Sequence, residues 1–136
     1  MTALNSENAY DLNGDGTVSR SIMDETNCYQ NETILFKADE TGVMTSNSYA
    51  DISVDMEVGT TNQYEYTIAC ISVAGTDYFT YLQTGNQVDL FLHNDMVQAT
   101  LSGNTLIYVI PGAFFVADPD EGIHIFEDLT FVYTKQ

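Results

Sequence analysis

Residues 51–58 read Asp-Ile-Ser-Val-Asp-Met-Glu-Val, and this stretch decides the fold class. Four apolar residues in it (Ile52, Val54, Met56 and Val58) alternate with acidic or small polar ones. Successive side chains of a β-strand point to opposite faces, so this alternation is typical of a strand that is buried on one face. The stretch therefore predicts an antiparallel strand with one face toward a core and a charged face toward solvent.

The same two-residue period runs through most of the chain from Glu32 to the C-terminus. Short turn signals divide it into strands; the main ones lie at 59–62, 74–77, 84–86, 102–104, 111–112 and 118–122. Connections this short predict sequential antiparallel pairing. We therefore expect an all-β fold, a single up-and-down antiparallel meander barrel of about eight strands, because closing the sheet removes its exposed edges.

Residues 1–31 are polar and lack this period, so we expect them to form an irregular N-terminal segment packed on a barrel of residues 32–136. The two parts together make one structural domain. Ser21 is expected to cap a short helical turn that ends by Asn27. The strand-like piece in this segment is expected at Ala9–Leu12.

The charge balance restricts the partners. The 136 residues include 20 Asp and Glu but only three Lys and Arg, for a net charge of −17. Phosphate backbones and anionic membrane surfaces would be repelled, which argues against nucleic acid as a partner. Cations and basic protein partners would be attracted. No run of 18 apolar residues occurs, so no transmembrane segment is predicted.

Residues 1–8 contain neither the basic region nor the apolar stretch of a signal peptide. Two settings fit this observation. The protein is either cytoplasmic, or it is an exported protein whose signal is absent from this sequence.

Residues 11–19 read Asp-Leu-Asn-Gly-Asp-Gly-Thr-Val-Ser and match the first half of an EF-hand calcium loop. Hard oxygen ligands stand at alternate positions, and Gly16 allows the sharp turn. Position 12 of the loop is Ile22 rather than a bidentate acid, so a later carboxylate would have to close the site. The candidate calcium ligands are Asp11, Asn13, Asp15, Thr17, Ser19, Asp24 and Glu25. The alternative is a turn in which the Asx side chains cap the loop's own backbone.

Cys28 and Cys70 are the chain's two cysteines. They are either joined in one disulfide or buried as free thiols, and the sequence leaves both possibilities open.

A ligand pocket inside the barrel is a second candidate site. Its expected lining is aromatic: Phe36, Tyr64, Tyr66, Phe91, Tyr108 and Phe131. A small barrel usually fills its interior with side chains, so the sequence favours a packed core over a cavity for a small apolar ligand. An acid–base enzyme using His93 or His124 is a third hypothesis. It is the least favoured, because no nucleophile elbow, metal-binding helix or phosphate loop accompanies these histidines.

Several pieces of the chain together are similar to the lipocalin-like domains of secreted bacterial proteins and lipoproteins. They are Asp-Leu-Asn-Gly-Asp-Gly at 11–16, Glu25-Thr-Asn-Cys28, the stretch 33–42 and Leu129-Thr-Phe-Val-Tyr133. The resemblance implies a calycin-type meander barrel, export to the periplasm, cell surface or medium, and a role in binding rather than catalysis. It provides no catalytic residues.

Overall fold

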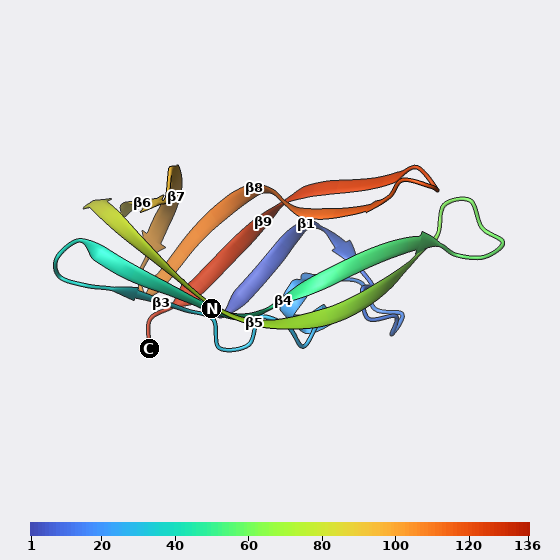
Figure 1. Ribbon diagram of the computed structural model, residues 1–136, viewed down its shortest axis with the longest axis horizontal. Helices are drawn as coiled ribbons and strands as arrows, with labels where there is room; N and C mark the ends of the chain where they lie inside the picture. Colours follow the sequence, from blue (N-terminus) through green and yellow to red (C-terminus); the bar gives the residue numbers. More distant parts are fainter.

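The structure, a computed structural model that describes residues 1–136, is one curled antiparallel sheet in the shape of a half-barrel (Figure 1). The all-β antiparallel fold predicted from the alternating stretches is confirmed. The nine strands are β1 (Ala3–Tyr10), β2 (Ser19–Ser21), β3 (Thr33–Phe36), β4 (Thr41–Met56), β5 (Tyr64–Thr84), β6 (Gln87–Leu92), β7 (Asp95–Ser102), β8 (Thr105–Asp118) and β9 (Ile123–Thr134). The one helix is α1 (Ile22–Glu25).

The strand order is β2-β1-β9-β8-β7-β6-β5-β4-β3. From β3 to β9 each strand pairs with its neighbour in the chain, as a meander requires. The first strand then returns to the last, with Ala3 opposite Val132 and Ser6 opposite Leu129. The sheet therefore ends at β2 on one side and at β3 on the other. The helix is too short to span a membrane.

The quoted stretch 51–58 forms the end of β4. Val54 is 2% exposed and belongs to the core, whereas Asp51 and Asp55 lie on the exposed face. Val58 departs from the predicted alternation and is 97% exposed. The reason is that β4 ends at Met56, so Val58 already lies in the turn that leads to β5.

Two predicted turns are bulges within long strands, which is a correction to the sequence-based strand boundaries. Residues 74–77 lie inside β5, at a bulge where two residues of β5 lie opposite a single residue of β4, Asn47. Pro111 and Gly112 lie inside β8, where three residues oppose Asp128 of β9. Gly and Pro disturb a ladder without ending it when the partner strand continues past them, and the result is a bend. The carboxylate of Asp128 accepts the freed amide of Gly112 at 2.9 Å.

The bends create two arms, the outer parts of the β4–β5 and β8–β9 hairpins, and the N-terminal segment packs between them (Figure 1). Leu4, Leu12 and Ile22 of the segment, each at most 1% exposed, join buried residues of both arms in one core. The predicted Ser21 cap is present, since its hydroxyl accepts the amide of Asp24. The strand expected at Ala9–Leu12 begins earlier, at Ala3, because its ladder partner is the distant β9.

A second core lies at the other end of the half-barrel, beneath β6 and β7. Its buried members are Phe79, Val88, Leu90, Ala99, Leu106, Tyr108 and Tyr133. Phe79 lies across Gly42 of the adjacent strand. A Cβ atom added to Gly42 would be 2.0 Å from the tip of the Phe79 ring. The absence of a side chain at Gly42 thus allows this ring to pack against the sheet.

Gly42→Ala is therefore expected to destabilise the protein by about 1–3 kcal/mol, as overpacking of a buried site does. Gly85→Ala is the matched control, because Gly85 has a positive φ of 62° but no atom within 4 Å of the position that an added Cβ would take. It should cost about 1 kcal/mol from backbone strain alone. Urea unfolding monitored by circular dichroism measures both. Equal costs would contradict the proposed contact between the ring and Gly42.

Candidate functional site

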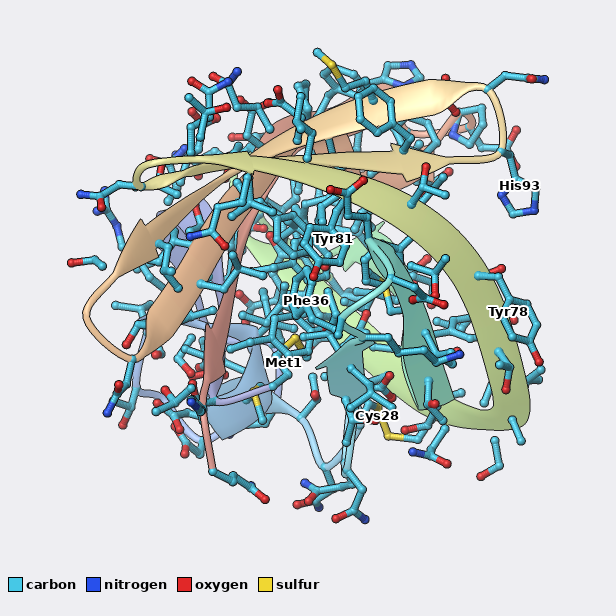
Figure 2. All side chains as sticks on the ribbon, turned by 90° about the vertical axis from the view of Figure 1, so that its left-hand side faces the viewer. Met1, Cys28, Phe36, Tyr78, Tyr81 and His93 are labelled. Carbon is cyan, nitrogen blue, oxygen red and sulfur yellow. A yellow bond between two sulfur atoms is a disulfide. The ribbon has the colours of Figure 1, made fainter.

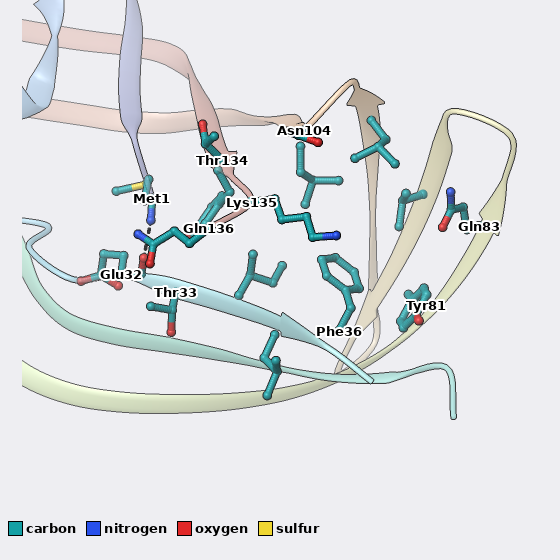
Figure 3. A pocket seen from close by; sticks show the side chains of 16 residues that line it. Met1, Glu32, Thr33, Phe36, Tyr81, Gln83, Asn104, Thr134, Lys135 and Gln136 are labelled. Atoms are coloured by element: carbon teal, nitrogen blue, oxygen red, sulfur yellow. Dashed lines mark hydrogen bonds between the residues drawn. The ribbon is translucent and has the colours of Figure 1, made fainter. Parts of the chain in front are cut away.

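A groove opens at the end of the half-barrel between β3 and the C-terminal end of β9 (Figure 3). Its volume is about 590 Å³, which is within the range of ligand-binding pockets. Nine of its 16 lining residues are hydrophobic. The sheet ends at β3 without a further strand, so the groove is the place where the barrel remains open.

The floor of the groove is aromatic because Phe36 of β3 and Tyr81 of β5 line it, and the buried ring of Phe79 packs behind Phe36. The ring centroid of Phe36 lies 4.9 Å from that of Tyr81 and 5.4 Å from that of Phe79. The Tyr81 hydroxyl donates to the carbonyl of Lys37 at 2.8 Å, which fixes its ring. Figure 2 looks toward this end, with Phe36, Tyr81 and Met1 pointing into the half-barrel and Tyr78 pointing away.

Lys135 provides the one basic side chain of the groove. Its ammonium group extends across the opening toward Phe36 (Figure 3). Glu32, which also lines the groove, is engaged elsewhere, since its carboxylate accepts the amides of Asn47 and Ser48 at 2.8 and 3.3 Å. The groove therefore combines an apolar floor with one basic side chain in a protein of net charge −17.

A smaller hollow of about 240 Å³ lies further inside the half-barrel. Met1, Glu32 and Tyr133 line both spaces and stand between them. Tyr108 and Phe131 are stacked at a centroid distance of 5.0 Å in its wall. Burial raises the pKa of the Tyr108 and Tyr133 hydroxyls, so both stay neutral at physiological pH.

The aromatic residues predicted to line one pocket occupy different places. Phe36 lines the groove, Tyr108 and Phe131 line the inner hollow, and Tyr66 packs edge-on against Tyr10 at 6.0 Å. Tyr64 and Phe91 are 43% and 41% exposed. Phe91 stands outside because its neighbours Leu90 and Leu92 hold the inward positions of β6, an alternation that the sequence already contains.

Three buried glutamates, Glu25, Glu32 and Glu127, were not singled out as a group by the sequence. Each accepts main-chain amides at a point where the sheet ladder is interrupted. Glu25 accepts those of Leu12 and Asn13, and Glu127 accepts that of Asn8 at 3.0 Å. Glu127 follows Ile123 and Ile125 on the inward face of β9. The place of an acidic residue in this apolar alternation is the feature of the sequence that could have predicted its burial.

Glu127 also binds the side chains of Asn8 and Tyr10, which fastens the end of β1 to β9. Burial opposes ionisation of Glu127, but the hydrogen bonds from Tyr10 and Asn8 outweigh burial and hold the pKa of its carboxyl below the ordinary value of 4.5. Burial and the bond to Glu127 raise the pKa of the Tyr10 hydroxyl. The pair is therefore a neutral phenol that donates to a carboxylate.

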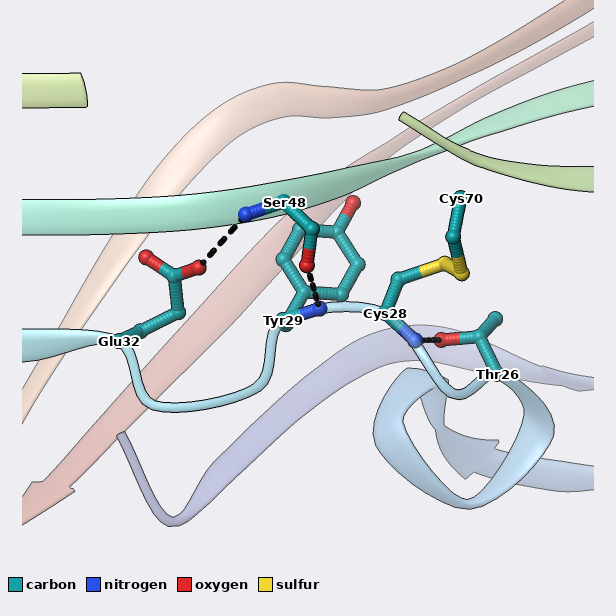
Figure 4. The surroundings of a disulfide bond; sticks show 6 residues. All are labelled: Thr26, Cys28, Tyr29, Glu32, Ser48 and Cys70. Atoms are coloured by element: carbon teal, nitrogen blue, oxygen red, sulfur yellow. Dashed lines mark hydrogen bonds between the residues drawn. A yellow bond between two sulfur atoms is a disulfide. The ribbon is translucent and has the colours of Figure 1, made fainter. Parts of the chain in front are cut away.

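A disulfide joins Cys28 to Cys70 with a Cα–Cα distance of 5.3 Å, so the structure has the bridge rather than two free thiols. Around it, the amide of Tyr29 donates to the Ser48 hydroxyl, and the amide of Cys28 donates to the Thr26 hydroxyl (Figure 4). The bridge ties the segment after α1 to β5. It thereby holds Glu32, and with it β3, in place at the edge of the groove.

The loop with the calcium-like spacing caps its own backbone. The Asp11 carboxylate accepts the amides of Asp15 and Gly16, and Asn13 and Asp15 accept the amides two residues after them. Glu25, one candidate for the closing ligand, faces Leu12 and Asn13 instead. Asn13, Asp15, Thr17 and Asp24 are exposed, Asp11 is half-buried, and Ser19 opens β2. No group of three or more His, Cys, Asp or Glu side chains is arranged around one metal position.

The two histidines lie at opposite ends of the molecule. His93 is in the β6–β7 turn with a φ of 54° (Figure 2). His124 is the second residue of β9 and lies opposite Ala117, near the β8–β9 turn. They do not form a common acid–base site.

Comparison of the chain with protein-family models, with curated proteins and with solved structures finds no match. The resemblance to lipocalin-like domains therefore stays a prediction.

The Glu127→Gln variant tests the role of the buried carboxylate. The wild-type pKa is lower in the folded than in the unfolded protein, so ionised Glu127 stabilises the fold above pH 4.5, and this contribution disappears as the pH falls through the folded pKa. We expect the variant to be less stable by about 1–3 kcal/mol at pH 7. The difference in the free energy of unfolding between the wild type and the variant should become smaller below pH 4.5.

Chemical denaturation at several pH values measures this, with Glu121→Gln in the exposed β8–β9 loop as the control. A stability difference for Glu127→Gln that does not change with pH would contradict the proposed role.

Proposed function

We propose that this protein is a non-enzymatic binding domain whose ligand site is the groove between β3 and the end of β9. The observation that supports the proposal is the combination of a groove of about 590 Å³ with an aromatic floor and the basic side chain of Lys135. Apolar ligands gain about 25 cal/mol for each Å² removed from water on such a floor. Lys135 would favour a ligand that also carries a hydrogen-bond acceptor or a negative charge.

The disulfide supports a secreted or cell-surface setting for this domain. Disulfides form and persist outside the cytosol, in the periplasm and on cell surfaces. The Cys28–Cys70 bridge ties the chain to β5 four residues before Glu32, which lines the groove. A lipocalin-like carrier or surface module agrees with this setting and with the curled meander sheet.

Dodecanoate tests the groove, because it has an apolar chain and one carboxylate. We expect it to displace the dye 1-anilinonaphthalene-8-sulfonate from a single saturable site with a Kd of about 1–100 μM. Ile34→Thr should weaken binding about three- to tenfold, since it removes apolar contact from the groove wall. Displacement should not depend on calcium.

Ile107→Thr is the matched control, because it makes the same change in β8 at the residue that follows Leu106 and lies outside the groove. Absence of any saturable site, or equal loss in the two variants, would reject the groove as the ligand site.

We propose, as a second activity, that the loop at 11–17 binds calcium. Three Asx side chains, Asp11, Asn13 and Asp15, turn toward the same loop interior, and their oxygens keep free lone pairs beyond the backbone bonds. The Thr17 carbonyl would add a ligand. Since Glu25 is engaged with the backbone, water would complete the coordination. The ion would then stabilise the N-terminal segment between the two arms.

Calcium at millimolar concentration is expected to raise the melting temperature, because binding to the folded state alone stabilises it. Asp15→Asn should weaken the effect at least tenfold while it keeps the bond to the Thr17 amide. Asp95→Asn, an exposed change at the start of β7, is the control. Calorimetry without heat, together with an unchanged melting temperature, would reject the proposal.

A further inference from the structure

The groove runs along the edges of two strands rather than over the face of one. Four consecutive residues of β3, Thr33–Phe36, line it, and so do residues 133–136, which are the last two residues of β9 and the two that follow it. Consecutive residues of a strand point to opposite faces. A hollow that both sets contact must therefore lie beside the strand edges and separate them.

The gap between these edges is one strand wide at its inner end. There the chain itself fills it with Met1 and Thr2. The amino group of Met1 donates to the carbonyl of Glu32, immediately before β3, and the amide of Thr2 donates to the carbonyl of Val132 in β9 at 2.7 Å. Two adjacent residues thus connect both edges by main-chain hydrogen bonds. Beyond Met1 the same gap continues as the groove.

Main-chain groups of both edges face the groove. The amide of Lys37 donates to the carbonyl of Thr41, so Lys37 turns its main chain toward β4. In an antiparallel ladder this orientation alternates from one residue to the next. The amide and carbonyl groups of Ile34 and Phe36 therefore point away from β4. Glu32, which bonds to Met1, fits the same alternation. The amide of Lys135 bonds to Asn104 beside β8, so Thr134 turns its main chain away from β8. Ile34 and Phe36 thus form one row of main-chain groups without a strand partner, and Thr134 alone forms a second, shorter one opposite it.

The strand directions allow one further strand to pair with both rows. Every pairing from β3 through to β9 is antiparallel, and six pairings separate the two strands, so β3 and β9 run in the same direction. One strand that runs opposite to both would continue the line of β1. It would close the half-barrel with antiparallel ladders on either side.

We propose that the groove binds an extended peptide segment, which inserts as a strand between β3 and β9; this rests on the groove being the ligand site proposed above. Alternate side chains of the peptide face the apolar floor at Ile34, Phe36 and Leu106. Main-chain bonds to both edges supply affinity, and the inward pockets supply specificity, as in other cases of β-strand addition. The net charge of −17 attracts a peptide with basic ends through the field of the whole protein, and these ends are expected to project beyond the groove, away from Lys135.

The probe is acetyl-Lys-Val-Thr-Val-Thr-Val-Lys-amide, followed by calorimetry and amide hydrogen exchange. We expect a 1:1 complex in which the amides of Ile34 and Phe36 become protected from exchange. The amide of Leu35 faces β4 and serves as the internal control, with unchanged exchange. An analogue N-methylated at both threonines keeps the side chains but loses one row of donors, and it should bind at least tenfold more weakly.

Thr134→Pro removes the amide of β9 that faces the groove and leaves the ladder to β8 intact. It should weaken peptide binding about three- to tenfold, the effect of one lost hydrogen bond. Thr134→Ala loses the same side chain, including its bond to the Thr2 hydroxyl, but keeps the amide, so it should weaken peptide binding less than Thr134→Pro does. Circular dichroism of both variants checks that the fold is kept.

The outcomes separate this inference from the proposed function. Dodecanoate binding in the groove without peptide binding at 1 mM would overturn the peptide assignment and leave the groove as a small-molecule site. Equal affinity for the N-methylated analogue would overturn the strand geometry. If neither dodecanoate nor the peptide binds, both proposals fail.

Discussion

Main-chain amides that lose their ladder partners are the central constraint on this fold. The sheet bends at bulges and β1 leaves β9 after Ser6, and each interruption frees amides that burial would otherwise leave unsatisfied. Buried carboxylates accept them. Glu32 does so at the bulge of β4, Glu127 where β1 leaves β9, and Glu25 at the start of the exposed loop. A buried carboxylate is costly without such donors, so each glutamate and its amides stabilise one another.

These bonds determine where the N-terminal segment lies, and the segment in turn determines the shape of the site. It fills the space between the arms, and the Cys28–Cys70 bridge holds its last part against β5. Glu32 follows directly and leads into β3. The edge of the groove is therefore positioned by the same contacts that complete the core at the opposite end of the molecule.

The groove exists because the sheet curls without closing. A closed barrel satisfies every strand edge, whereas here β3 and the end of β9 keep a gap that Met1 and Thr2 bridge only at one end. An open edge next to an apolar floor invites association, and the protein limits this with short β3 and a strongly acidic surface. Both proposed ligand classes use the same gap, one through apolar contact and charge and the other through main-chain pairing.

The sequence by itself determined the strand class and the meander, because a two-residue alternation allows only half-buried strands and short turns force antiparallel neighbours. It also placed the Ser21 cap, since capping depends on residues three apart. Only the tertiary structure decided that Ala3–Tyr10 pairs with β9, that Pro111 and Gly112 bend a strand rather than end it, and that Glu127 is buried. Each of these depends on a partner more than 10 residues away in the chain. Local pattern does not encode such contacts, so the groove, which lies between two distant edges, could not be located from the sequence.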